Sequence, residues 1–207
     1  MKFIELKKIY IFDLDGVLID SKKNMSISWN AVRKILNIET KFINYFGEIG
    51  IPFKEILKKL KINRNKHIKA EIIFKSTSKK NFDSIKLYPK VLDTIKKLRN
   101  EKKIIGILTS KDKIRTKMIL NHFNIKVDFI LCPESKKYSK PNPFQILRVI
   151  DKFKVKKKEV VFFGDTNLDK ITAKRAKVDF VYCKYGYGNL NNYKKFVISR
   201  FSQVSKL

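Results

Sequence analysis

The stretch IYIFDLDGVLIDS, residues 9–21, opens on apolar residues and then sets two carboxylates two positions apart. Its YIF run, residues 10–12, predicts a buried strand, because a short run of β-branched and aromatic residues suits a covered sheet. Asp13 and Asp15 follow this run at once. Two acids so close repel each other, and burying either of them unpaired is costly. The stretch therefore predicts a positively charged partner at the end of the strand.

The composition indicates a folded, globular chain. Its 207 residues are 43% hydrophobic and 12% aromatic, which is enough to form a main core and a smaller inserted domain. No apolar run approaches the ~20 residues that span a bilayer, and Asp13 and Asp15 arrive before the apolar region of a signal peptide could form. Cys132 and Cys183 stand far apart in apolar surroundings, as core residues of a reduced protein do. We therefore expect a cytoplasmic protein with no membrane partner.

The net charge is extreme, with 48 basic against 19 acidic residues and a formal value of +29. One interpretation is a nucleic-acid-binding protein. The other is compositional drift, because Lys, Ile, Asn and Phe abound together, as A/T-rich codons would produce. The lysines are scattered through every segment, and Arg, the better reader of bases, is scarce beside Lys. We favour drift and expect no specific nucleic-acid partner, although so positive a field attracts small anionic substrates.

The later part of the chain alternates predicted strands with predicted helices. Beyond Tyr88, short apolar runs indicate strands, and amphipathic stretches between them indicate helices. This alternation predicts an α/β fold with a doubly wound, parallel, Rossmann-like sheet, to which the strand before Asp13 also belongs. The expected strands cover residues 104–108, 129–131, 160–163, 180–183 and 196–198, and the expected helices start at Pro89 or cover residues 112–123, 143–153 and 167–177.

Between the first strand and Tyr88 the pattern is helical throughout. Met25, Trp29, Val32 and Leu36 recur at the spacing of one face of an amphipathic helix, and two further helical stretches follow. Helices inserted between the first and second strands of a sheet form a separate unit. We therefore expect an inserted α-helical cap domain over residues 21–85, and an α/β core domain over residues 1–20 and 86–207.

Polar residues follow four of the predicted strands, and ligands bind beyond the carboxyl ends of strands in an open parallel sheet. Four carboxylates among them cannot share a small site without a cation, and an all-oxygen ligand set suits Mg²⁺. The sequence therefore predicts a magnesium ion as the partner of the acids. The candidate site residues are Asp13 and Asp15 after the first strand, Thr109 and Ser110 after the second, Lys140 after the third, and Asp165 and Asp169 after the fourth.

Some of these residues also have a purely structural interpretation. Thr109 and Ser110 precede a predicted helix, where Thr and Ser are typical N-caps. Lys140 is one of very many lysines and is singled out only by its KPNP context. Asp169 stands in the first turn of a predicted helix, where an acid stabilises the helix dipole. Taken one by one, these residues leave both interpretations open.

Four short motifs in this order resemble those of the haloacid dehalogenase superfamily, and within it the phosphoglycolate phosphatase-like group with a helical cap. They are DLDGV at residues 13–17, Thr109 at the end of an apolar strand, Lys140 in KPNP, and GDTNLD at residues 164–169. Each motif alone is weak, whereas four in order at predicted strand ends are specific. The resemblance extends over essentially the whole chain.

The resemblance implies a phosphatase whose reaction passes through an aspartyl-phosphate. It implies that Asp13 is the nucleophile and that Asp15 protonates the leaving oxygen and then deprotonates the hydrolytic water. Thr109 and the backbone N–H of Ser110 would bind phosphate oxygens, and Lys140 would neutralise nucleophile and phosphate together. The side chains of Asp13, Asp165 and Asp169 and the carbonyl of Asp15 would hold Mg²⁺, with Asp169 acting directly or through a water molecule.

The expected substrate is a small phosphorylated metabolite, such as phosphoglycolate or a sugar phosphate, and the expected assembly is a monomer or a dimer. A sugar phosphomutase similar to β-phosphoglucomutase is the nearest alternative, because it shares both aspartates and the cap. A nucleic-acid end-processing phosphatase is favoured by the charge alone, and the length of the cap argues against a polymeric substrate. Asp15 argues against a dehalogenase, because the dehalogenases of the superfamily lack this second acid.

Overall fold

The computed structural model describes residues 6–207, apart from the side chain of Lys136. Its chain divides into two compact units, Met1–Ile19 with Leu87–Leu207, and Asp20–Lys86. The boundaries between these units differ by one residue from the domain boundaries expected from the sequence. The assignment of the two units as functional domains stays a prediction. The expectation about a signal peptide rests partly on residues 1–5, which lie outside the described residues.

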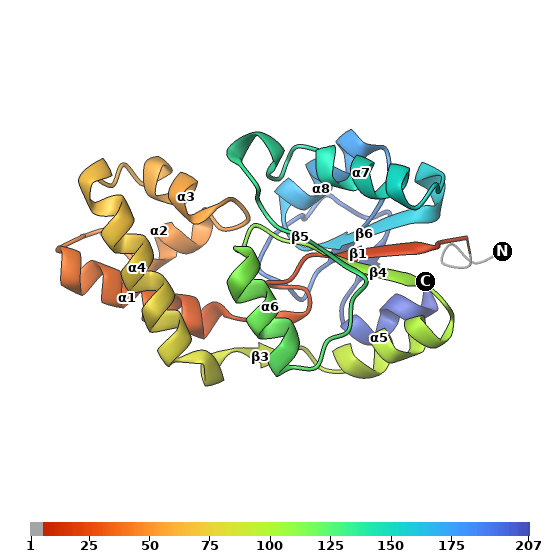
Figure 1. The fold of residues 1–207 in the computed structure, drawn as a ribbon, viewed down its shortest axis with the longest axis horizontal. Helices are drawn as coiled ribbons and strands as arrows, with labels where there is room; N and C mark the ends of the chain where they lie inside the picture. Colours follow the sequence, from red (N-terminus) through yellow and green to blue (C-terminus); the bar gives the residue numbers. More distant parts are fainter. Residues whose placement is uncertain (1–5) are drawn as a thin grey trace. The chain divides into compact units, whose positions relative to one another are not determined.

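A six-stranded sheet forms the centre of the first unit (Figure 1). Its strand order is β5-β4-β1-β6-β7-β8, and every neighbouring pair is parallel. The expected α/β fold with a parallel, Rossmann-like sheet is thus confirmed, and β1 lies between β4 and β6. The strands are β1 (Ile9–Phe12), β4 (Ile104–Leu108), β5 (Phe129–Leu131), β6 (Val160–Gly164), β7 (Asp179–Cys183) and β8 (Val197–Ile198).

Both faces of this sheet are covered, because alternate residues of β1 point to opposite sides. On one face, Ile9 and Ile11 belong to an apolar cluster that includes Ile146 of α7 and Ala173 of α8. On the other face, Phe12 stacks on Phe163 of β6 with ring centroids 4.8 Å apart and also contacts the ring of Phe201. The helices of this unit are α5 (Val91–Asn100), α6 (Lys113–His122), α7 (Phe144–Lys152) and α8 (Asn167–Ala176), with short 3₁₀ helices η3 (Lys136–Tyr138), η4 (Lys157–Glu159) and η5 (Phe201–Lys206).

The second unit is built from helices around its own apolar core. The expected helical face of α1 is confirmed, because Met25, Trp29, Val32 and Leu36 are all buried. The Trp29 ring stacks on the Tyr45 ring at 4.7 Å, and its Nε1 donates to the carbonyl of Thr40 at 2.9 Å. The helices of this unit are α1 (Lys22–Leu36), α2 (Phe42–Gly47), α3 (Phe53–Lys59), η1 (Arg64–Lys66), α4 (His67–Lys80) and η2 (Phe82–Ser84). Two short strands, β2 (Ile19–Asp20) and β3 (Lys86–Leu87), pair with each other at the two ends of the unit.

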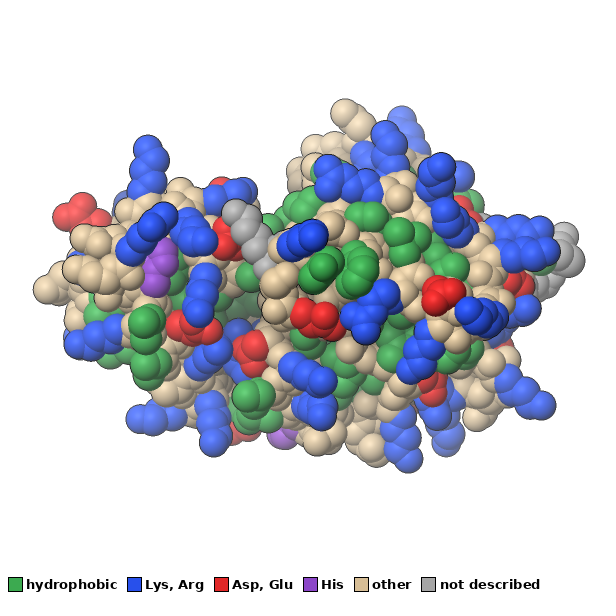
Figure 2. Space-filling view, turned by 45° about the horizontal axis from the view of Figure 1, so that its top comes forward, with side chains coloured by type: hydrophobic (Ala, Val, Ile, Leu, Met, Phe, Trp, Pro, Cys, Tyr) green, Lys and Arg blue, Asp and Glu red, His purple; other side chains and the backbone are tan. Residues whose placement is uncertain are grey.

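Lysine and arginine side chains cover much of the molecular surface. Figure 2 shows them spread across the visible face of both units, with hydrophobic and acidic side chains between them, and not gathered into one stripe. This distribution agrees with the dispersed lysines of the sequence. None of the helices within residues 6–207 is long and apolar enough to cross a membrane.

Candidate active site

Three neighbouring strands bring the predicted site residues to one edge of the sheet. Phe12 of β1 pairs in register with Ile107 of β4 and with Phe163 of β6. The residues that follow these strands therefore emerge side by side. Asp13 is tied into this edge by its backbone N–H, which donates to the carbonyl of Phe163 at 2.9 Å.

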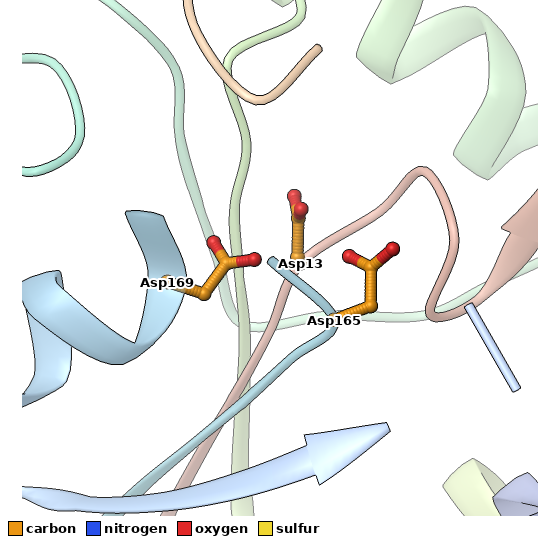
Figure 3. Close-up of side chains that lie close together, drawn as sticks. All are labelled: Asp13, Asp165 and Asp169. Carbon is orange, nitrogen blue, oxygen red and sulfur yellow. The ribbon is translucent and has the colours of Figure 1, made fainter. Parts of the chain in front are cut away.

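Three buried carboxylates meet at this edge (Figure 3). Asp13 follows β1, Asp165 follows β6, and Asp169 lies in the first turn of α8. One oxygen from each lies within 4.8 Å of the others, and the side chains of Asp165 and Asp169 are fully buried. The structure therefore brings together three acids that are 4 to 156 positions apart in the sequence.

Two glycines pack closely against the side chain of Asp165. A Cβ on Gly16, whose φ is +85°, would lie 2.3 Å from Asp165 Oδ2, and a Cβ on Gly186 would lie 2.4 Å from Asp165 Cβ. Oδ2 accepts a hydrogen bond from the backbone N–H of Tyr187 at 2.6 Å. Oδ1 is buried and has no hydrogen-bond partner among the described residues. A buried carboxylate oxygen without a donor is costly unless a cation binds it.

Asp169 uses both of its oxygens. Oδ1 accepts from Lys140 Nζ at 2.7 Å, while Oδ2 accepts from the backbone N–H and the hydroxyl of Thr166 at 3.0 and 2.6 Å. The bond from the Thr166 N–H, together with the bond that the backbone N–H of Asp169 donates to the Thr166 hydroxyl at 3.3 Å, forms a capping box at the start of α8, which satisfies amide groups that the helix leaves open. Asp169 therefore has the structural role of a first-turn acid and also lies among the candidate metal ligands.

Lys140 is the positive centre of the cluster. Its Nζ lies 3.0 Å from Asp13 Oδ2 and 2.7 Å from Asp169 Oδ1, and only 1% of its side chain is exposed. Burial alone would lower the pKa of the Lys140 ammonium group, but the two carboxylates outweigh it and raise this pKa above its usual value. Lys140 therefore stays charged and holds the two acids together.

The acids themselves resist full ionisation. Burial raises the pKa of Asp13 to about 7 against the opposing charge of Lys140, and the negative charges of Asp169 and Asp15 add to the rise. Burial, followed by the charges of Asp169 and Asp13, likewise raises the pKa of Asp165 well above its usual value. Additional positive charge at the cluster would favour the ionised forms of both groups.

Asp15 has a partner that the sequence motifs do not indicate. Lys111 Nζ lies 3.2 Å from Asp15 Oδ1, with 8% of the Lys111 side chain and 16% of the Asp15 side chain exposed. Burial lowers the pKa of Lys111, and the Asp15 carboxylate opposes that shift. The only hint in the sequence is that Lys111 directly follows Thr109 and Ser110 at the end of β4, and the abundance of lysine hides it.

Thr109 and Ser110 are not the N-caps of the helix that follows. The N-cap of α6 is Asp112, whose side chain accepts from the backbone N–H of Arg115 at 3.0 Å. Thr109 is buried, and its hydroxyl accepts from the backbone N–H of Lys111 at 3.2 Å. The structural alternative considered for Thr109 and Ser110 is therefore wrong, and their place at the site edge needs another explanation.

The donor set of the cluster fits a divalent cation. Asp13, Asp165 and Asp169 offer carboxylate oxygens that lie within 4.8 Å of one another, and one buried ammonium group, that of Lys140, contacts two of these acids. A divalent cation would supply further positive charge to the three acids. The unpartnered Oδ1 of Asp165 points to the same conclusion, and carboxylate oxygens are the ligands that hard cations prefer. The cluster can therefore hold a metal ion.

The chain is similar to bacterial phosphatases along nearly its whole length. It is 26% identical over 204 residues to a phosphoglycolate phosphatase of Aquifex aeolicus, covering 97% of this chain and 96% of that protein. It is 24% identical over 189 residues to the pyrophosphatase PpaX of Oceanobacillus iheyensis, covering 90% of this chain and 87% of that protein.

The fold is similar to that of solved hydrolase structures. A solved structure of a haloacid dehalogenase-like family hydrolase from Streptococcus pneumoniae superimposes with a TM-score of 0.82, at 19% identity, over 98% of each chain. At this identity the likeness shows the fold alone. The family model for haloacid dehalogenase-like hydrolases matches residues 10–183, a span that includes the three buried carboxylates and both site lysines. The resemblance seen in the sequence motifs is confirmed, and the chain is an enzyme that belongs to the haloacid dehalogenase-like hydrolase family.

Proposed function

We propose that this hydrolase removes the phosphate group from a small phosphomonoester in two steps, through a phosphorylated Asp13 and with Mg²⁺ as its cofactor. The observation that carries the proposal is the environment of the Asp13 side chain. Its side chain is buried and is held by Lys140 at 3.0 Å, beside an Asp165 oxygen that has no partner among the described residues. A carboxylate that a buried ammonium group holds beside a candidate cation site is suited to attack an anionic phosphate once the cation is bound.

In the first step, a carboxylate oxygen of Asp13 forms a bond to phosphorus as the bond from phosphorus to the leaving oxygen breaks. Asp13 Oδ1 accepts from the backbone N–H of Leu14 at 2.7 Å, and Oδ2 faces Lys140, so the orientation of the nucleophile is set before the substrate arrives. Asp15 donates its proton to the leaving oxygen, which departs as an alcohol.

In the second step, water attacks the phosphorus of the aspartyl-phosphate and Asp15 takes up a proton from that water. The bond from phosphorus to Asp13 breaks, inorganic phosphate leaves, and both aspartates return to their starting states. Lys140 compensates the negative charge on Asp13 and on the transferred group throughout. Thr109 and the backbone N–H of Ser110 lie at the end of β4, beside Asp13, where they bind phosphate oxygens.

Asp13, Asp165 and Asp169, with the carbonyl of Asp15, would hold Mg²⁺. Bound there, the ion would supply positive charge that lessens the repulsion between Asp13 and the phosphate dianion and stabilises the charge of the transition state. Burial and then the neighbouring carboxylates raise the pKa values of Asp13 and Asp165, and this supports a cation at this place, because added positive charge favours the ionised forms of both acids.

Phosphoglycolate or a sugar phosphate is the proposed kind of substrate. The similarity to a phosphoglycolate phosphatase over 97% of the chain supports a small phosphomonoester. In the cap segment at residues 46–52, Glu48 is the only charged side chain, and it is engaged by Lys59 at 2.6 Å. A segment so poor in free charged groups is badly equipped to retain a bisphosphate, which favours a phosphatase over a phosphomutase.

Hydrolysis of phosphoglycolate, sugar phosphates and p-nitrophenyl phosphate, followed as phosphate release with and without Mg²⁺, tests this proposal. The wild-type protein should release phosphate only with the metal, and Asp13→Asn should lose turnover by at least about a thousandfold, because a neutral amide is not a competent nucleophile. Asp151→Asn is the matched control, since Asp151 is exposed and pairs with an exposed lysine.

Three outcomes would overturn this proposal. Substantial turnover by Asp13→Asn, or in the presence of EDTA, would exclude the proposed chemistry. Phosphorus NMR on a hexose 1-phosphate covers the phosphomutase, because faster appearance of the 6-phosphate than of free phosphate would show transfer between sugar oxygens.

A further inference from the structure

Lys111 is one of three ion-paired lysines among the described residues whose side chains are almost fully buried, with Lys7 and Lys140. Only 8% of its side chain is exposed, and its Nζ lies 3.2 Å from Asp15 Oδ1. In the pair between Lys154 and Asp151, by contrast, each side chain is about 80% exposed. Exposed pairs of that kind contribute little. A buried ammonium group needs a charged partner. Removing the ammonium group leaves the charge of that partner uncompensated.

The surroundings of Lys111 leave Asp15 as its direct partner. Arg115 and Asp112, the other charged groups near it, form an ion pair with each other at 2.6 Å. The backbone N–H of Lys111 donates to the Thr109 hydroxyl at 3.2 Å, which fixes the start of the side chain. The backbone of Asp15 is held by a bridge to Ile19. Both ends of the contact are therefore anchored.

We propose that Lys111 is a positioning residue whose ammonium group holds the Asp15 carboxyl group in the orientation that serves proton transfer to and from the substrate. This inference rests on the proposed function, in which Asp15 gives its proton to the leaving oxygen as the bond from phosphorus breaks. The strand-end segment 109–111 then has two tasks: its first residues bind phosphate oxygens, and its third orients the acid. None of the four sequence motifs includes Lys111.

A positioning role makes a prediction that a structural role does not. An alkoxide is a poor leaving group and needs the proton from Asp15, whereas p-nitrophenolate leaves readily without it. The ratio kcat/KM reports the steps up to departure of the leaving group. Lys111→Met should therefore lower kcat/KM for an alkyl phosphate such as phosphoglycolate at least about tenfold more than for p-nitrophenyl phosphate, because general acid catalysis contributes about 10² to 10⁴.

A double-mutant cycle tests whether Lys111 acts through Asp15. In an Asp15→Asn background, Lys111→Met should change kcat/KM for p-nitrophenyl phosphate by no more than about twofold, because the group it orients is already lost. Lys113→Met is the matched control in the wild-type background, since Lys113 is exposed and lies outside the site. Lys111→Arg, which retains a cation, should recover part of the lost activity on the alkyl phosphate.

The results that would overturn the inference are distinct from failure of the proposed function. Equal losses on the two substrates, or a loss in the Asp15→Asn background as large as in the wild type, would show that Lys111 does not act through Asp15. If Lys111→Met fails to melt cooperatively, Lys111→Gln supplies the same comparison of substrates. Absence of phosphate release by the wild-type protein, in contrast, would overturn the proposed function itself.

Discussion

Lys140 shows how a single side chain can hold a cluster of like charges together. It bridges Asp13 and Asp169 while almost fully buried, so one ammonium group compensates both carboxylates. Removing one partner of a buried pair leaves an uncompensated charge, which costs about 3 to 5 kcal/mol. At this site the uncompensated charges would be those of the proposed nucleophile and of its neighbour.

Lys140→Ala should therefore lower kcat by at least about a hundredfold, which is the usual cost of removing one electrostatic stabiliser of a transition state. Lys157→Ala and Lys97→Ala, which alter exposed lysines, should leave turnover within about twofold. Steady-state kinetics on one substrate with saturating Mg²⁺ provides the comparison. If position 140 were no outlier among these three variants, Lys140 would have no part in the reaction.

At the scale of elements, the loop after β7 packs against the loop after β1 and the end of β6. Gly186 comes within the contact distance of Gly16 and of Asp165, and the neighbouring Tyr187 N–H fixes Asp165 Oδ2. Tyr185 of the same loop donates from its hydroxyl to the carbonyl of Val17 at 2.9 Å. The two loops thus hold Asp165 in a single orientation, with Oδ1 left for a ligand.

Gly186→Ala should weaken metal binding, because the new Cβ would meet Asp165 Cβ at 2.4 Å and the backbone oxygen of Gly16 at 2.5 Å. We expect the Mg²⁺ concentration for half-maximal activity to rise at least about tenfold, in line with the loss of a group that orients a metal ligand. Gly47→Ala is the matched control, because a Cβ there meets nothing within 4 Å. An unchanged requirement for Mg²⁺ in Gly186→Ala would argue against Asp165 as a ligand.

For the whole molecule, the carboxylate cluster links stability to pH and to metal. The pKa of Asp13 is raised from an ordinary 3.8 to about 7 in the folded protein. Without metal, the contribution of this group to stability is full below pH ~4 and is lost as the pH rises through about 7. A bound cation reverses the effect, because it favours the ionised carboxylates.

Mg²⁺ should therefore raise the melting temperature by little at pH 5, where it binds weakly, and by about 5 to 10 °C at pH 8, if the ion is present at about a hundred times its dissociation constant at pH 8. Differential scanning calorimetry with and without Mg²⁺ at the two pH values measures this difference directly. Asp165→Asn should abolish the increase. An equal increase at both pH values would mean that Mg²⁺ binds elsewhere.

The net charge of +29 also acts at the scale of the whole molecule. Dispersed lysines neutralise phosphates but do not read bases, so we expect weak binding to DNA that falls steeply with salt and does not depend on sequence. Fluorescence anisotropy with two unrelated duplexes at 50 and 200 mM salt measures both properties. Tight binding to one duplex at the higher salt would favour a nucleic-acid substrate after all.

The sequence by itself determined the sheet and the polar residues along its edge. Asp13, Thr109 and Asp165 each follow directly on an apolar strand, and parallel strands end at the same edge of a sheet. Local order along the chain was therefore enough to bring these residues together. The helical face of α1 followed in the same way, because its spacing depends only on the period of a helix.

Only the tertiary structure decided which of the remaining groups meet. Asp112 caps α6 in place of Thr109 and Ser110, and Lys111 reaches Asp15 although only its position after these two residues distinguishes it among 48 basic residues. The glycines around Asp165 come from loops about 170 positions apart. Such contacts depend on loop conformation and on the path of long side chains, and these are set by packing between distant segments and not by any periodic pattern along the chain.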